Sequence, residues 1–177
     1  MFKMIEGFAT TEGTGNFAVR STAHKENFRR IHDLTLSNIG VGTYLGNPDL
    51  ETDTEQKNAV KQSILKGVNV IDTAINYRAQ KSERTVGKAI SELIEDGKIN
   101  RSEIFVSTKN GYVTNDGDIQ EDFMAYIMRE LGKTGVVKEG DISAQYNCMT
   151  VPFLEDQLAR SQKNLGLDCI DLMYLHN

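Results

Sequence analysis

Short apolar runs alternate along the chain with segments that repeat their apolar positions at helical spacing. The runs are rich in Val, Ile, Phe and Tyr, which favour strands over helices or loops. Four of them are predicted to form strands, at residues 38–43, 68–72, 103–109 and 169–176. Because long segments separate these runs, neighbouring strands are not expected to be joined by hairpins.

The segments between the strands predict three helices. The first is expected over 54–66, with Thr52 and Glu55 as a capping box and Gly67 at its end. The second has its apolar stripe at Val86, Ala89, Ile90, Leu93 and Ile94, and Gly97 ends it. The third begins near Pro152, carries Leu154, Leu158 and Leu165 on one side, and ends at Gly166.

Strands and helices in this order predict a parallel sheet with right-handed crossovers. The segment GVGTYLG lacks the G-x-G-x-x-G spacing of a dinucleotide-binding open sheet, so a barrel is favoured. A full barrel takes roughly 250 residues. The predicted fold class is therefore α/β, a (β/α)8 TIM-barrel type of which this chain carries only about the first four β/α units.

The barrel half is expected over residues 28–177, with two further segments of different character. Residues 1–27 show little periodicity and are predicted to be an N-terminal extension that is mobile or lies loosely on the surface. Residues 112–150 form a long insertion between the third strand and the third helix, in which 121–131 have an amphipathic helical pattern. Because it follows the end of a predicted strand, this insertion is expected to overhang the carboxyl ends of the strands as a lid.

Composition and charge narrow the functions that need consideration. The 177 residues carry a net charge of -5 and a pI near 5.3, which argues against nucleic acid or an anionic membrane as partner. No apolar run approaches the roughly 18 residues that span a bilayer, so a cytoplasmic location is expected. The cysteines, Cys148 and Cys169, are too few for a disulfide framework, and no metal site is expected.

Four residues of complementary chemistry follow or end the predicted strands. They are Asp72, Tyr77, Lys109 and His176. In a parallel barrel the carboxyl ends of the strands meet at one rim, where active sites form. An ammonium beside a phenol favours the phenolate, and a carboxylate keeps the ammonium charged and oriented. Each residue alone has an ordinary structural explanation, but the set predicts protonation of an oxyanion as it forms on a carbonyl.

The motifs GVGTY, IDTAINY, SERTVGKAI, VSTK and NLGLDCIDLMYLHN, in this order, resemble the aldo-keto reductase superfamily. The resemblance implies a barrel enzyme that moves hydride from NADPH, with NADH as the alternative, to a small-molecule aldehyde or ketone. It implies Tyr77 as the proton donor, assisted by Lys109 and Asp72, and His176 as the residue that holds the carbonyl. It also places Gly42, Thr43, Tyr44 and Asp72 beside the cofactor.

This sequence departs from the family in its number of strand-helix units. Later units hold much of the cofactor in the family, so the chain is expected to be incomplete for cofactor binding. The alternative is a non-catalytic, truncated relative or an interaction module. Open strand edges invite pairing, so self-association or a missing C-terminal half is expected to cover them.

Overall fold

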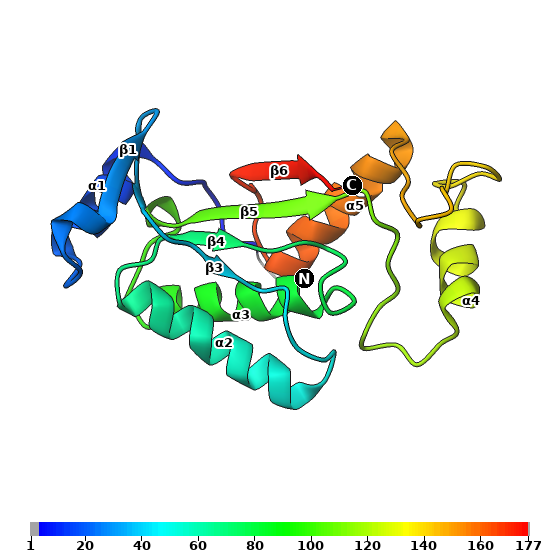
Figure 1. The fold of residues 1–177 in the computed structure, drawn as a ribbon, viewed down its shortest axis with the longest axis horizontal. Coiled ribbons are helices and arrows are strands. Elements are labelled where there is room, and N and C mark those ends of the chain that lie inside the picture. The colour runs from blue at the N-terminus through cyan, green and yellow to red at the C-terminus, as the bar shows by residue number, and fades with distance from the viewer. Residues whose placement is uncertain (1–3, 177) are drawn as a thin grey trace.

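The computed structural model describes residues 4–176, which are organised around a four-stranded parallel sheet (Figure 1). The strands are β3 (Val41–Gly42), β4 (Val70–Asp72), β5 (Phe105–Asn110) and β6 (Leu172–Leu175), in that spatial order. Every neighbouring pair is parallel, which confirms the predicted pairing. The first strand is shorter than the predicted range 38–43, because only two of its residues pair with β4.

Three helices connect the strands: α2 (Leu50–Leu65), α3 (Lys81–Glu95) and α5 (Val151–Leu165). Because the strands are adjacent in chain order, right-handed crossovers place all three on one face of the sheet. Helix α3 packs against both α2 and α5. The fold is thus a parallel α/β sheet with one face covered by helices (Figure 1).

The helix ends follow from local chemistry, with one correction to the sequence prediction. Helix α2 begins at Leu50, four residues before the predicted start, because the Asp49 side chain accepts a hydrogen bond from the Thr52 amide. The predicted capping box at Thr52 is therefore wrong. Helix α5 has Pro152 in its first turn and ends at Gly166 with φ of 66°, as predicted.

The strand register decides which side chains face the helices. Ile71 and Val106 are paired neighbours, fully buried beneath the helices, and Thr108 on the same face of β5 contacts α3. Since side chains alternate along a strand, the neighbours Asp72 and Ser107 lie on the other face. The face without helices therefore carries Asp72 and Ser107, together with Leu172, which is 37% exposed.

The main hydrophobic core lies between the sheet and the helices. It joins segments that are far apart in the sequence, and its buried members are Phe17, Val60, Ile64, Ile71, Val86, Ala89, Ile90, Leu93, Ile99, Ile104, Val106, Leu165 and Leu167. A core built from so many distant segments fixes the strand ends relative to one another.

The N-terminal segment packs more tightly than its sequence suggests. Helix α1 (Thr11–Arg20) buries Phe17 in the main core, and the Ala9 amide donates to Asp171 Oδ1 at 2.7 Å. A Cβ at Gly13 would lie 2.2 Å from the Ser102 carbonyl oxygen, so only glycine permits this approach. The prediction of a mobile or loosely placed segment is wrong for residues 4–20, because one buried aromatic and close backbone contact suffice to fix it.

Short elements complete this end of the molecule. Strands β1 (Phe28–Ile31) and β2 (Leu34–Ser37) form an antiparallel hairpin, and short 3-10 turns occupy Lys25–Asn27 and Arg101–Glu103.

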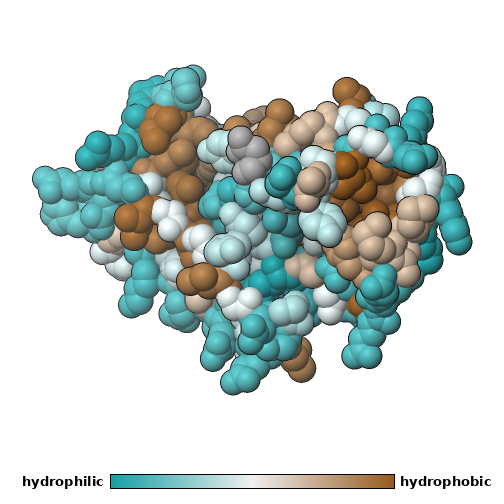
Figure 2. Space-filling model, turned by 45° about the vertical axis from the view of Figure 1, so that its right-hand side comes forward, coloured by the Kyte–Doolittle hydropathy of each residue, from teal (hydrophilic) through white to brown (hydrophobic). Residues whose placement is uncertain are grey.

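The insertion lies beyond the carboxyl ends of the strands, where the β5 arrow points in Figure 1. It contains α4 (Phe123–Ile127) and a π-helical turn (Met128–Gly132), close to the helix predicted at 121–131. Its apolar residues Val113, Tyr126, Ile127, Leu131, Val137 and Cys148 form a cluster with Phe153 of α5. Figure 2 shows apolar side chains around a hollow on this side, and an apolar groove of about 550 Å³ runs between Met124, Met128 and Ile142.

Candidate active site

The structure brings a carboxylate, an ammonium and a phenol ring together at the carboxyl end of the sheet. Lys109 Nζ donates to Asp72 Oδ2 at 2.6 Å and to the Thr73 carbonyl oxygen at 2.8 Å. The same nitrogen lies 4.6 Å from the centre of the Tyr77 ring. Lys109 thus forms an ion pair with Asp72 and a cation–π contact with the Tyr77 ring.

Strand register explains why Asp72 and Lys109 meet. Asp72 ends β4 and pairs with Ser107 on β5, and Lys109 lies two residues further along the same face. Ser107 Oγ donates to Asp72 Oδ1 at 3.1 Å, which holds the second carboxylate oxygen. Ser107 was not predicted as a site residue, although its spacing of two from Lys109 would have identified it.

Tyr77 lies in the turn after β4 and is the centre of a row of aromatic rings. Its ring meets that of Tyr44 edge to face at 5.0 Å between centres, and that of His176 at 5.9 Å. On the far side of His176, Tyr112 makes a further edge-to-face contact at 5.0 Å. The four predicted catalytic residues, Asp72 among them, therefore converge at one rim of the sheet.

His176 directly follows β6, and its surroundings favour the neutral imidazole. Burial lowers its pKa below the ordinary value of 6.5, the Lys109 ammonium lowers it further, and the Asp72 carboxylate opposes this. Its Nδ1 is buried and has no hydrogen-bond partner among the described residues. A neutral imidazole can donate one hydrogen bond and accept another.

The residues predicted at the cofactor lie beside this group. Gly42 pairs with Asp72, and apart from its two chain neighbours no described residue comes within 4 Å of where a Cβ at Gly42 would be. Thr43 is buried, with its Oγ1 2.9 Å from Thr73 Oγ1. Tyr44 is 67% exposed and presents its ring next to Tyr77. An open backbone and an exposed aromatic ring beside the phenol fit a flat, partly apolar group such as a nicotinamide ring.

The two ends of the insertion meet next to His176. Tyr112 and Asn147 form an isolated antiparallel bridge, and Asn147 Nδ2 donates to the His176 carbonyl oxygen at 3.1 Å. The Cys148 amide donates to the Gly111 carbonyl oxygen at 2.8 Å. Neither Tyr112 nor Asn147 was predicted, because they are far apart in sequence and only the folded insertion brings them together.

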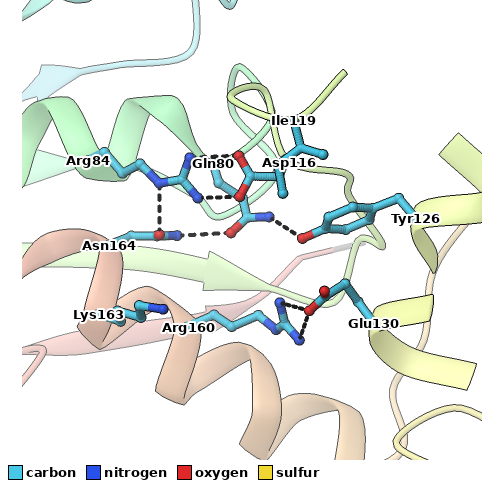
Figure 3. Close-up of a pocket in the computed structure, with 9 residues that line it drawn as sticks. All are labelled: Gln80, Arg84, Asp116, Ile119, Tyr126, Glu130, Arg160, Lys163 and Asn164. Atoms are coloured by element: carbon cyan, nitrogen blue, oxygen red, sulfur yellow. Dashed lines mark hydrogen bonds and ion pairs between the residues drawn. The ribbon is translucent and has the colours of Figure 1, made fainter. Parts of the chain in front are cut away.

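A second, polar cavity of about 500 Å³ lies between the insertion and helices α3 and α5 (Figure 3). Gln80 links its two walls, donating to the Tyr126 hydroxyl at 3.2 Å and accepting from Asn164 at 3.3 Å. Arg84 donates both amino groups to charged partners there, including a bidentate contact with Asp116. Asp72, Tyr77, Lys109 and His176 do not line this cavity, so it is separate from the candidate active site.

Residues 4–176 contain neither a candidate metal site nor a candidate membrane-spanning helix. No group of three or more His, Cys, Asp or Glu side chains there is arranged to hold a metal ion. Among the helices of the same residues, none combines the length and the apolar content needed to cross a membrane. Cys148 and Cys169 are both free thiols.

Comparison with known proteins gives a consistent result. Residues 38–177 match the family model described as the Aldo/keto reductase family. Among curated proteins, the NADH-specific methylglyoxal reductase of Escherichia coli (strain K12) is 29% identical over 81% of this chain and 39% of its own length.

Solved structures agree on the fold. The holo form of aldo-keto reductase AKR11C1 from Bacillus halodurans superposes with a TM-score of 0.57 at 22% identity, covering 85% of this chain and 40% of that one. An aldo/keto reductase from Klebsiella pneumoniae, solved with NADP and acetate, gives a TM-score of 0.51 at 19% identity, covering 81% and 36%. The chain thus spans two fifths or less of the length of these relatives.

Proposed function

Because the chain belongs to the aldo/keto reductase family, we propose that it carries the proton-donating site of an oxidoreductase that reduces a small aldehyde or ketone. The observation that carries this proposal is the position of Lys109, whose ammonium contacts both the Asp72 carboxylate and the Tyr77 ring. A charged group beside the phenol ring supports this proposal, because a nearby ammonium favours the phenolate that proton transfer to a developing alkoxide leaves behind.

The proposed reaction assigns one role to each side chain. Tyr77 Oη gives its proton to the carbonyl oxygen as hydride reaches the carbonyl carbon, which produces an alcohol and a phenolate. Lys109 stabilises the phenolate by its charge, Asp72 holds Lys109 in place, and water returns the lost proton to Tyr77 afterwards. Neutral His176 donates a hydrogen bond to the carbonyl oxygen and orients it.

A nicotinamide cofactor would supply the hydride. Gly42, Thr43, Tyr44 and Asp72 are the residues of this chain that we propose beside its nicotinamide ring, because Tyr44 contacts the Tyr77 ring and Gly42, paired with Asp72, leaves open space. NADPH is the proposed cofactor, with NADH as the alternative. One relative is named for NADH and another was solved with NADP, so both cofactors belong in the test.

We propose that the sheet is part of an eight-stranded barrel and that its bare face is covered by additional chain. Leu172 and Tyr174 lie on the face without helices and are 37% and 48% exposed, and β6 has an unpaired edge among the described strands. Either the remaining strands of a full-length relative or a second copy of this chain would cover this face.

The catalytic proposal is tested by Tyr77→Phe, which removes only the hydroxyl. In a form extended by the C-terminal strands of a full-length relative, reduction of methylglyoxal is followed with NADPH and with NADH, and cofactor binding is measured separately by fluorescence. We expect the rate to fall by about 10²- to 10⁴-fold while cofactor binding stays unchanged. The matched control is Tyr146→Phe, which makes the same change in an exposed residue of the insertion and should keep the full rate.

Two outcomes would count against this function. A Tyr77→Phe variant with the full rate would reject Tyr77 as the proton donor. A wild type in this extended form that binds neither cofactor and reduces nothing would instead support the alternative of a non-catalytic relative.

Association is tested by light scattering on the purified chain over a dilution series. We expect a mass above that of one chain for the wild type. The mass should fall when Leu172→Lys and Tyr174→Lys are introduced. A stable single-chain mass for the wild type would contradict the proposal that the bare face is covered by a second copy.

A further inference from the structure

The turn that follows Tyr77 has an uncommon backbone. Arg78, Ala79 and Gln80 all lie in the left-handed region, with φ of 51°, 52° and 72°. A residue with a side chain rarely adopts this conformation, and three in succession persist only where the surroundings hold them there. The turn directly joins Tyr77 to the start of α3 at Lys81, so whatever holds it also places the phenol.

Arg78 holds the turn from the side of α2. Its side chain is only 1% exposed, and its Nε donates to the Asn47 carbonyl oxygen at 2.8 Å. Its Nη1 donates to Gln56 Oε1 at 2.9 Å, and its Nη2 to Asp53 Oδ1 at 2.5 Å and the Asp49 carbonyl oxygen at 3.2 Å. All four acceptors belong to the loop before α2 or to its first two turns, so one guanidinium fixes the turn to a single rigid element.

Gln80 holds the turn from the opposite side. It is 3% exposed, and its Nε2 donates to the Asn115 carbonyl oxygen at 3.0 Å and to the Tyr126 hydroxyl at 3.2 Å (Figure 3). The Gly117 amide adds a backbone contact by donating to the Ala79 carbonyl oxygen at 2.9 Å. The insertion therefore braces the turn through Gln80, while α2 braces it through Arg78.

The Tyr77 ring itself is held by contacts with little directional demand. It meets the rings of Tyr44 and His176 edge to face and the Lys109 ammonium from one side. Such contacts tolerate sliding and rotation far better than a set of hydrogen bonds does. The accuracy with which the phenol is placed must therefore come from the backbone of the turn.

We propose that Arg78 and Gln80 are positioning residues for Tyr77, which hold the left-handed turn between α2 and the insertion so that the phenol stays beside Lys109 and His176. The proposal rests on the proposed function for its catalytic meaning. The claim that these two side chains fix the position of the Tyr77 ring can be tested without measuring catalytic activity.

The test follows the Tyr77 ring by NMR in the full chain with ¹³C-labelled tyrosine and histidine. The readout is the cross-relaxation between the Tyr77 and His176 rings, whose centres lie 5.9 Å apart, and the Tyr77 signal is identified by its loss in Tyr77→Phe. We expect this cross-peak to disappear in Arg78→Gly and in Gln80→Leu. Arg78→Lys should not restore it, because an ammonium cannot reproduce the fork of the guanidinium.

Ala79→Gly is the matched control. It changes the middle residue of the same turn, relieves a left-handed conformation that alanine disfavours, and removes neither brace. We expect it to keep the Tyr77–His176 cross-peak and the wild-type chemical shifts. Arg78→Gly likewise relieves its own backbone strain, so its effect reports the lost guanidinium and not a strained replacement.

Each result decides the question. If Arg78→Gly and Gln80→Leu lower the melting temperature but keep the cross-peak and shifts, the two residues are merely structural and the proposal is overturned. If Arg78→Gly does not fold, Gln80→Leu, on the other side of the turn, decides alone. In a reductase-competent form, the turnover rate should fall more than tenfold with little change in KM. A wild type without reductase activity would reject the proposed function, while the NMR result would still decide the positioning role.

Discussion

The two sides of the rim site depend on different parts of the molecule. Asp72 and Lys109 are carried by β4 and β5, which rest on the main core. His176 lies beside Tyr112 and Asn147, at the point where the insertion begins and ends. Asp72 and Lys109 are therefore held by the main core, whereas Tyr77, through the turn that Gln80 braces, and His176 also depend on the insertion.

The insertion is attached to α3 largely by charged groups. Arg84 contacts Asp116 and Asp118, and Lys81 contacts Asp118 at 2.6 Å. Ion pairs near the surface contribute little to the free energy of unfolding, and salt weakens them further. Buried apolar contacts are not weakened by salt in this way. The comparison indicates that the surroundings of His176 can loosen under conditions that leave the Asp72–Lys109 pair intact.

The largest expected effect comes from damaging the main core. Ile90→Ala removes a fully buried side chain of α3 and should lower the free energy of unfolding by about 2–5 kcal/mol. Urea titration followed by circular dichroism measures this loss. Both sides of the site should be lost together, and a variant that unfolds only near the insertion would break the comparison.

The same type of change in the insertion should act locally. Leu131 is buried in the insertion cluster, and Leu131→Ala should remove hydrogen-exchange protection from residues 111–150 while the amides of β4 and β5 stay protected. Exchange measured by mass spectrometry tests this. Equal loss of protection in both regions would show that the insertion and the main core are one cooperative unit.

A smaller effect is expected from the charged contacts between the two regions. Arg84→Met removes the contacts with Asp116 and Asp118 and should lower the stability of the insertion by about 1 kcal/mol, an effect that shrinks at high salt. The control is Arg129→Met, which removes contacts with Glu121 and Glu130 inside the insertion. If the two variants expose residues 111–150 equally, the contacts to α3 have no special role.

The smallest effect concerns the pH dependence of stability. Burial raises the pKa of the Glu83 carboxyl above 4.5, although hydrogen bonds from Thr108 and Asn164 oppose this. The folded protein then keeps a proton that the unfolded chain releases, so this stabilisation is complete below pH 4.5 and is lost as pH rises through the folded pKa. Glu83→Gln cannot ionise, and its free energy of unfolding should fall less over that range. Parallel pH profiles of variant and wild type, from urea titrations, would contradict this.

Much of the fold follows from local sequence patterns. The strand runs, the apolar stripe of α3 and the ends of α5 at Pro152 and Gly166 each depend on residues close in sequence, and the structure confirms them. The early start of α2 was missed because Asp49 precedes the apolar pattern and competes with Thr52 as a cap. The packing of α1 was missed because it depends on Gly13 meeting Ser102, a contact between distant residues.

The convergence of the candidate active-site residues could also be predicted in part from the sequence. Parallel pairing brings strand ends together, so residues at the ends of separate strands could be expected to converge, and Asp72, Lys109 and His176 do. The brace through Arg78 could not be predicted, because its side chain bonds to a loop some thirty residues away. The same holds for Tyr112 and Asn147, which meet His176 only once the insertion has folded.

The convergence of these side chains is tested most directly by the titration of His176, followed by NMR in the wild type, Lys109→Met and Asp72→Asn. The wild-type pKa should lie below 6.5. It should rise in Lys109→Met, because a repelling ammonium is lost, and fall in Asp72→Asn, because a stabilising carboxylate is lost. A His176 pKa that is the same in all three proteins would show that the imidazole lies apart from the Asp72–Lys109 pair and would contradict the proposed site.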